Sequence, residues 1–221
     1  MSYRHFVFDL DGTLIDSRQD LADSVNVMLD TYGAAPLPAA EVVPMVGEGA
    51  RILVERVLAS ARQVADVDEA LSRFLEAYDA RLTATTRLYD GVLDTLAHLR
   101  TVAHISVLTN KPQLPSERIV HALGLRPHVH EVIGGDSPFG RKPSPGALAY
   151  LIEQGGVGAA RTLLVGDSWV DVATAVAGGV DACLVTYGFG YETVDAAHRQ
   201  AARWTIPRIG DVRALQADIG A

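Results

Sequence analysis

Residues 6 to 14, Phe-Val-Phe-Asp-Leu-Asp-Gly-Thr-Leu, place a short apolar run directly before two aspartates. Phe6 to Phe8 has the length and residue types of a buried β-strand. Side chains two residues apart on an extended backbone point the same way, so Asp9 and Asp11 can face the same space beyond the strand. Two carboxylates held that close need a shared proton or a cation. An Asp-rich turn without a further role has the same local pattern, so the rest of the chain must decide between the two interpretations.

Apolar runs and helical patterns alternate along the second half of the chain. The runs at 105–108, 132–133, 163–165 and 183–185 each follow a stretch with helical spacing of apolar residues. Such alternation predicts a parallel sheet with helices on its faces, and the strand at residues 5–8 is expected to join it. The predicted fold class is therefore α/β, with a doubly wound, mainly parallel, Rossmann-like sheet as its core.

Residues 16–86 have no convincing strand pattern and show helical periods instead. A first helix is expected from the apolar spacing between Leu21 and Tyr32, with Asp16 or Ser17 as its N-cap. The stretch 34–44 contains three prolines and is expected to be a linker or loop. Helical spacing returns around 52–57 and 71–82. We predict an all-helical domain at 16–86, inserted into an α/β domain formed by residues 1–15 and 87–221.

Composition limits the partners of this chain. The formal charge of -8 and the pI near 5.3 argue against nucleic acid, because phosphate backbones repel an acidic surface. No apolar stretch approaches the ~18 residues that span a bilayer, which predicts no membrane segment. The single cysteine, Cys183, lies in an apolar run and indicates core packing in a reducing compartment. We expect a cytoplasmic protein, either a monomer or a homodimer.

Polar clusters follow four of the predicted strands, and they contain the only two lysines of the chain. Ligands of open α/β sheets bind at the carboxyl ends of the strands, so one shared site is a better explanation than four unrelated turns. The clusters are Asp9 with Asp11, then Thr109-Asn110-Lys111, then Arg141-Lys142, and finally Asp167-Ser168 with Asp171 one helical turn later.

The residue types in these clusters indicate a chemistry. Asp9, Asp11 and Asp167 offer only hard oxygen ligands, without histidine or thiolate, and this set suits Mg²⁺. A dication beside a carboxylate nucleophile stabilises the charge that spreads over phosphoryl oxygens in a transition state. We therefore predict hydrolysis of a small phosphorylated metabolite through an aspartyl phosphate.

Three further side chains supply the donors that phosphoryl oxygens need. Thr109 contributes a hydroxyl, Asn110 an amide and Lys142 a cation. These three residues are the predicted phosphate-binding group.

In their order and residue types, the four clusters resemble the motifs of the haloacid dehalogenase superfamily across the whole predicted core. The resemblance implies that Asp9 is the nucleophile and that Asp11 is the general acid and then the base. Dehalogenases displace halide and lack an acid at this second position, so Asp11 favours a phosphatase or a phosphomutase.

The resemblance also implies the remaining roles. Thr109 and Lys142 would hold the phosphoryl group. Asp167 would bind Mg²⁺ together with Asp9 and the backbone carbonyl of Asp11, and Asp171 would support the metal site from nearby. The helical insertion at 16–86 corresponds to the cap of the family, which closes over the site and selects the substrate.

Two stretches are similar to the phosphoglycolate phosphatase branch of this superfamily: 46–53, and 166–171 followed by 186–191. Gly47 and Gly49 precede a helix start, where Arg51 could bind a substrate carboxylate. Glu48 and Arg51 are therefore candidates for substrate specificity, although both could simply cap and solvate the helix.

The predicted function is that of a Mg²⁺-dependent 2-phosphoglycolate phosphatase. A phosphomutase similar to β-phosphoglucomutase is the alternative, as is a sugar-phosphate phosphatase or a pyrophosphatase on the same core. A catalytically silent phosphate-binding regulator is a further alternative, which the presence of both Asp9 and Asp11 disfavours.

Overall fold

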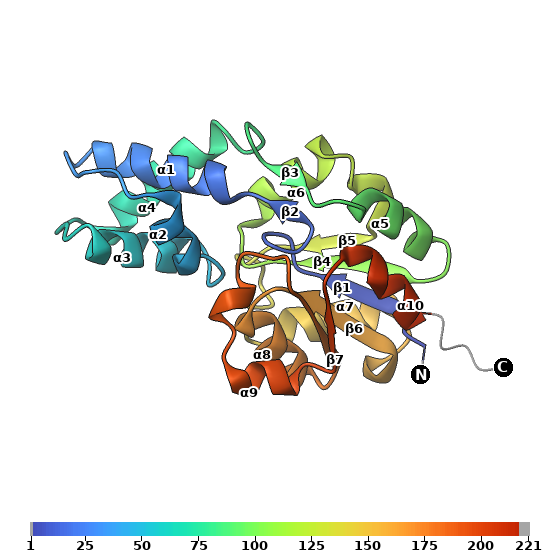
Figure 1. Ribbon diagram of the computed structural model, residues 1–221. Helices are drawn as coiled ribbons and strands as arrows, with labels where there is room; N and C mark the ends of the chain where they lie inside the picture. Colours follow the sequence, from blue (N-terminus) through green and yellow to red (C-terminus); the bar gives the residue numbers. More distant parts are fainter. Residues whose placement is uncertain (1, 217–221) are drawn as a thin grey trace.

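A six-stranded parallel sheet forms the centre of the protein (Figure 1). The computed structural model describes residues 2–216; residue 1 and residues 217–221, at the ends of the predicted α/β domain, lie outside the described part. The strand order is β5-β4-β1-β6-β7-β8, so the first strand lies in the middle of the sheet. The predicted α/β fold class is confirmed. The strands are β1 (His5–Phe8), β4 (His104–Leu108), β5 (Glu131–Ile133), β6 (Thr162–Gly166), β7 (Asp181–Val185) and β8 (Trp204–Ile206).

Helices cover both faces of this sheet, and the side-chain alternation of β1 explains why. Phe6 and Phe8 point into one apolar cluster and Val7 into the other. All residues of the strand are buried, as expected for a central parallel strand. The face of Phe6 contacts α5 (Val92–Arg100) and α6 (Gln113–Ala122), and the face of Val7 contacts α7 (Gly146–Gly155) and α8 (Trp169–Gly178). Shorter helices at the end of the chain are α9 (Ala196–Ala201) and α10 (Val212–Gln216).

Four helices in residues 18–79 lie together beyond one end of the sheet strands (Figure 1). Two short strands, β2 (Ile15–Asp16) and β3 (Arg87–Leu88), pair antiparallel where the chain leaves the sheet and returns. Within residues 2–216, no helix has both the length and the apolar character needed to cross a membrane. The four helices are α1 (Arg18–Asp30), α2 (Ala39–Val42), α3 (Ala50–Ser60) and α4 (Val67–Asp79).

Asp20 links the start of α1 to the segment that leads from α4 back to the sheet. Its carboxylate is fully buried and accepts hydrogen bonds from the backbone N–H and the hydroxyl of both Thr85 and Thr86, at 2.7 to 3.0 Å. These bonds hold the two connections between the helices and the sheet side by side.

Two elements differ from the sequence-based expectation. The stretch 34–44 was expected to be irregular, but it contains α2 and the first residues of a short 3-10 helix at Val43–Met45. Pro38 precedes α2 and Pro44 lies in the first turn of the 3-10 helix, positions where a missing N–H costs nothing. The strand β8 was not anticipated, because Thr205 interrupts its three residues and leaves no continuous apolar run.

Candidate active site

The carboxyl ends of β1, β4 and β6 open into one cavity between the sheet and the four helices. Parallel strands end at the same edge of a sheet, so residues far apart in sequence meet there. The helical side contributes mostly apolar or glycine residues, among them Val46, Gly47, Leu53, Phe74 and Tyr78. The polar wall of the cavity consists of Asp9, Asp11, Thr109, Asn110, Lys111, Asp167 and Ser168.

Lys142 joins two carboxylates beneath this cavity. Its Nζ lies 2.8 Å from Oδ1 of Asp9 and 2.6 Å from Oδ1 of Asp171, and its side chain is only 2% exposed. The other oxygen of Asp171 accepts hydrogen bonds from the backbone N–H and the hydroxyl of Ser168 in a capping box that starts α8. Burial works to lower the pKa of Lys142, but the charges of Asp171 and Asp9 outweigh it and raise that pKa.

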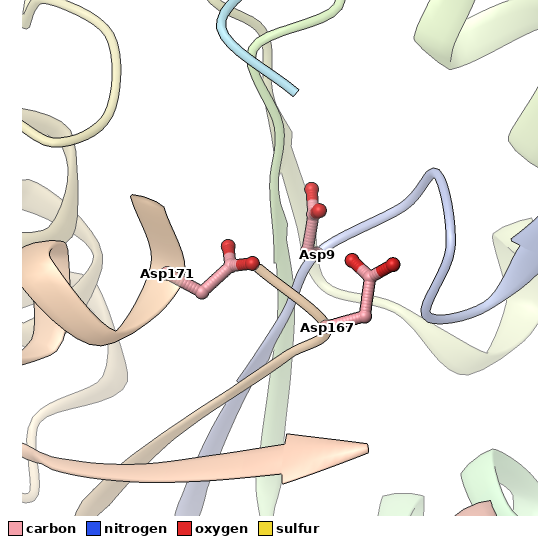
Figure 2. A group of neighbouring side chains, drawn as sticks. All are labelled: Asp9, Asp167 and Asp171. Carbon is pink, nitrogen blue, oxygen red and sulfur yellow. The ribbon is translucent and has the colours of Figure 1, made fainter. Parts of the chain in front are cut away.

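Three carboxylates converge at the strand ends: Asp9, Asp167 and Asp171 each place an oxygen within 4.8 Å of the other two (Figure 2). Burial raises the pKa of Asp9 to about 7 despite the contact with Lys142. Burial and the charges of Asp9 and Asp171 raise the pKa of Asp167 well above its usual range. The cluster therefore carries more negative charge than its surroundings balance, which favours a bound cation.

The donor set of this cluster fits a hard dication. Asp9 and Asp167 each have one carboxylate oxygen without a hydrogen-bond partner among the described residues, whereas both oxygens of Asp171 are engaged. Two glycines make room around Asp167. A Cβ on Gly12, which has φ +84°, would lie 2.0 Å from Oδ2 of Asp167, and a Cβ on Gly188 would lie 2.2 Å from its Cβ. The site is thus shaped around this carboxylate.

Asp11 makes contacts that differ from those of Asp9. Its Oδ1 accepts hydrogen bonds from Nζ of Lys111 at 2.8 Å and from the hydroxyl of Ser17 at 2.5 Å. The same ammonium donates to the hydroxyl of Tyr78 on α4 at 2.5 Å. Asp16 or Ser17 was expected to cap α1; Ser17 lies at the N-cap position, but it makes no side-chain cap bond and its hydroxyl donates to Asp11.

Sequence reasoning singled out Lys111 because lysine is rare in this chain, but it missed Ser17 and Tyr78 as neighbours of the site. The helical spacing of α4 predicts that Tyr78 is buried. It contains no signal that the hydroxyl meets a lysine from a loop 33 positions away.

Thr109 and Asn110, predicted as phosphate donors, are placed differently from each other. Thr109 is buried and lines the cavity, and its Oγ1 accepts a hydrogen bond from the backbone of Lys111, which leaves its proton free to be donated. Asn110 donates its two amide protons to the carbonyls of Gly47 at 2.9 Å and Lys142 at 3.0 Å. The side-chain amide of Asn110 therefore connects the helical side of the cavity to the sheet side. It was expected to donate to phosphate, but both of its protons are already used.

Glu48 and Arg51, the two candidates for substrate specificity, do not line the cavity. The guanidinium of Arg51 pairs with Asp68, and Glu48 pairs with Arg56. The Arg51 side chain is 42% exposed, and its pairing partners lie on the helices themselves. Of the two interpretations that the sequence left open, the geometry matches the one in which Glu48 and Arg51 solvate and stabilise the helix.

Comparisons with known proteins agree with this architecture. A phosphoglycolate phosphatase of Rhodospirillum rubrum is 38% identical over 213 residues, which cover 93% of this chain and 88% of that protein. Phosphoglycolate phosphatase 1 of Pseudomonas aeruginosa is 38% identical over 194 residues, 85% of this chain and 71% of the relative. A crystal structure described as a predicted phosphoglycolate phosphatase from Haemophilus somnus has a TM-score of 0.89 at 28% identity, and the match covers 97% of this chain and 98% of that one.

The family model for haloacid dehalogenase-like hydrolases matches residues 6–185, a range that includes every strand end around the cavity. With this match and the identity to the relatives, the chain belongs to the haloacid dehalogenase-like hydrolase family.

Proposed function

We propose that the protein is a Mg²⁺-dependent phosphatase that hydrolyses 2-phosphoglycolate through an aspartyl phosphate. The observation that carries the proposal is that Asp9 and Asp167 line one cavity, each with a free carboxylate oxygen, while Lys142 contacts Asp9 at 2.8 Å. The names of the relatives support the choice of substrate. Residues 1–15 and 87–221 would form the catalytic domain, and residues 16–86 the cap.

In the proposed reaction, the free carboxylate oxygen of Asp9 attacks phosphorus, and the bond between phosphorus and the ester oxygen breaks. Lys142 holds Asp9 in place and stabilises the negative charge of the phosphoryl oxygens, to which the hydroxyl of Thr109 donates. The second step is hydrolysis. A water attacks phosphorus, inorganic phosphate leaves, and the carboxylate of Asp9 is restored.

Asp11 would move the proton in both steps. It gives a proton to the departing alkoxide and then takes one from the attacking water. Its Oδ1 is held by Ser17 and Lys111, while its Oδ2 has no partner among the described residues. Asp11 lines the cavity, so it can reach an ester oxygen bound there.

Asp9, Asp167 and the backbone carbonyl of Asp11 would hold Mg²⁺. When bound, the ion would neutralise charge on the phosphoryl group and between the two carboxylates. Asp171 is not proposed as a ligand, because Lys142 and Ser168 use both of its oxygens.

The helical cap would exclude water and limit the size of the substrate. Two contacts already join it to the catalytic domain, from Asn110 to the carbonyl of Gly47 and from Lys111 to Tyr78. Leu53 and Phe74 present apolar walls to the cavity. Such a lid suits a small phosphorylated metabolite.

A substrate panel tests this proposal. Release of inorganic phosphate should be Mg²⁺-dependent, and kcat/KM should be higher for 2-phosphoglycolate than for hexose phosphates and pyrophosphate. Asp9→Asn should abolish turnover while the melting temperature stays near that of the wild type, because the substitution removes the attacking oxygen with little change in volume. Acid-quenched wild-type protein should carry covalent phosphate, and Asp9→Asn should not. Isomer formation from a sugar phosphate without free phosphate would contradict the proposal.

A further inference from the structure

Lys111 is a cation that the proposed phosphoryl chemistry does not use. Among the described residues that line the cavity, it carries the one positive charge. Lys142, the other lysine, is not part of the cavity lining; it contacts Asp9 and Asp171, and the proposed chemistry assigns it to the phosphoryl group. The ion pair of Lys111 with Asp11 at 2.8 Å offsets the cost of burying this charge, and the residue still lines the cavity.

The Lys111–Tyr78 pair retains two hydrogen-bond donors. The ammonium has three protons, and its contacts with Asp11 and Tyr78 use two of them. The hydroxyl of Tyr78 accepts from Lys111, so its own proton remains, and no acceptor for that proton occurs among the described residues. Both residues line the cavity. An anionic group there would receive one N–H and one O–H.

Both groups keep these protons at neutral pH. Burial raises the pKa of Tyr78 to about 12, so the hydroxyl stays protonated. The ammonium of Lys111 forms an ion pair with the carboxylate of Asp11 at 2.8 Å, the contact that a charged lysine makes.

The position of the pair also suits a carboxylate close to the scissile bond. Nζ of Lys111 lies 2.8 Å from Asp11, the residue proposed to protonate the ester oxygen. In 2-phosphoglycolate the carboxylate carbon is two bonds from that oxygen. The nearby cap residues Leu53 and Phe74 are apolar, and Arg51 pairs with Asp68 outside the cavity.

We infer that Lys111 and Tyr78 form the subsite that binds the carboxylate of the substrate and so select phosphorylated hydroxy acids over other phosphate esters. The inference rests on the proposed phosphatase function. Tyr78 belongs to the cap and Lys111 to the catalytic domain, so a bound carboxylate contacts both sides of the cavity at once. A site built to hydrogen-bond a charged group rejects analogues that lack it.

The test compares kcat/KM for 2-phosphoglycolate with kcat/KM for ethyl phosphate, which has the same two-carbon chain without the carboxylate. The ratio of the two values should fall about tenfold in Tyr78→Phe and by more in Lys111→Met, mainly through KM for 2-phosphoglycolate. Tyr32→Phe makes the same chemical change elsewhere in the cap, where the hydroxyl has no partner among the described residues, and should leave the ratio unchanged. Arg51→Met should also leave it unchanged.

The possible results distinguish failure of the proposed subsite from failure of the proposed phosphatase function. A wild-type ratio near one would overturn the proposed substrate and the subsite together. A high wild-type ratio that persists in Tyr78→Phe and Lys111→Met would overturn the subsite alone. If the ratio falls in Arg51→Met instead, the carboxylate binds at the start of α3 and the subsite is likewise overturned. Tyr78→Phe preserves the shape of the ring, so it decides the question even where Lys111→Met fails to fold.

Discussion

The ammonium of Lys142 lies 2.6 Å from Oδ1 of Asp171, and the side chains of both residues are only 2% exposed. Because the capping box of α8 uses the other oxygen of Asp171, the carboxylate has no freedom to turn towards a metal. It acts instead as a fixed support between a helix N-terminus and the lysine that contacts Asp9. The precision of the proposed phosphate site therefore depends on a residue that is not expected to touch the substrate.

Replacement of Asp171 by asparagine should lower kcat by about ten- to a hundredfold. An asparagine can still accept a hydrogen bond from Ser168, but it then presents an amide instead of a carboxylate to Lys142, and the ammonium loses its fixed position. Steady-state kinetics with the proposed substrate would measure the effect. Asp195→Asn is a suitable control, because Asp195 also caps a helix but lies exposed at the start of α9. Equal activity of Asp171→Asn and the wild type would show that Lys142 needs no such support.

Replacement of Asp20 by alanine should reduce the free energy of unfolding by roughly 2–4 kcal/mol, because the buried donors of Thr86 lose their acceptor. Urea unfolding followed by circular dichroism would measure the loss. Asp23→Ala on the same helix removes only a partly exposed carboxylate that pairs with Arg81, so its cost should stay below about 1 kcal/mol. Similar costs for the two variants would refute the role assigned to Asp20.

Short apolar runs that end in polar clusters were enough to predict most of the sheet. Strands β1, β4, β6 and β7 are apolar runs because both faces of an interior parallel strand are covered, and the edge strand β5 was still predicted from Val132 and Ile133. The edge strand β8 escaped detection, because Thr205 interrupts its three residues and leaves no continuous apolar run. A strand is therefore predictable from the sequence where it keeps a continuous apolar run, as β5 does at one edge of the sheet and β8 does not at the other.

Contacts between the helices α1–α4 and the strand-end loops were not predictable in the same way. Strand ends meet by topology, so Asp9, Thr109 and Asp167 could be grouped from the sequence, and the structure brings all three to one cavity. The contact of Tyr78 with Lys111 depends on how α4 is oriented over the sheet, and no local pattern encodes that orientation. Arg51 illustrates the same difficulty, because its position in the first turn of α3 could not distinguish the cavity from the outer surface.

Three histidines lie at the amino-terminal ends of the strands, opposite the cavity, and we expect them to make the folded protein less stable in acid. The ring of His104 lies 4.9 Å from that of buried His5 and 3.9 Å from that of His130, measured between centroids. Burial, with the neighbouring histidines, lowers the pKa of His5 to about 3, and burial and His130 lower that of His104 to about 4. The unfolded chain, with histidine pKa values near ~6.5, binds more protons than the folded one between about pH 6.5 and 3. Stability should therefore fall as pH falls through this range.

The contribution of His5 should be on the order of 2 kcal/mol between pH 7 and 5, with a smaller one from the more exposed His104. Urea unfolding at both pH values would measure it. His5→Gln keeps a hydrogen-bonding group for Ser106, whose Oγ lies 3.0 Å from Nε2 of His5, and it removes the titration. The variant should therefore lose less stability on acidification than the wild type. An identical loss in both proteins would mean that other groups cause the acid sensitivity.

Magnesium should stabilise the folded protein even without substrate. The convergence of Asp9 and Asp167 is unfavourable until a cation occupies the space between them, so Mg²⁺ at 100 times its dissociation constant should raise the melting temperature by roughly 5–10 °C. Asp167→Asn removes one proposed ligand and relieves part of the repulsion. This variant should melt at or above the wild-type temperature without Mg²⁺ and should respond little to the ion. Asp94→Asn, an exposed change on α5, should keep the full response, and a full response in Asp167→Asn would place the metal elsewhere.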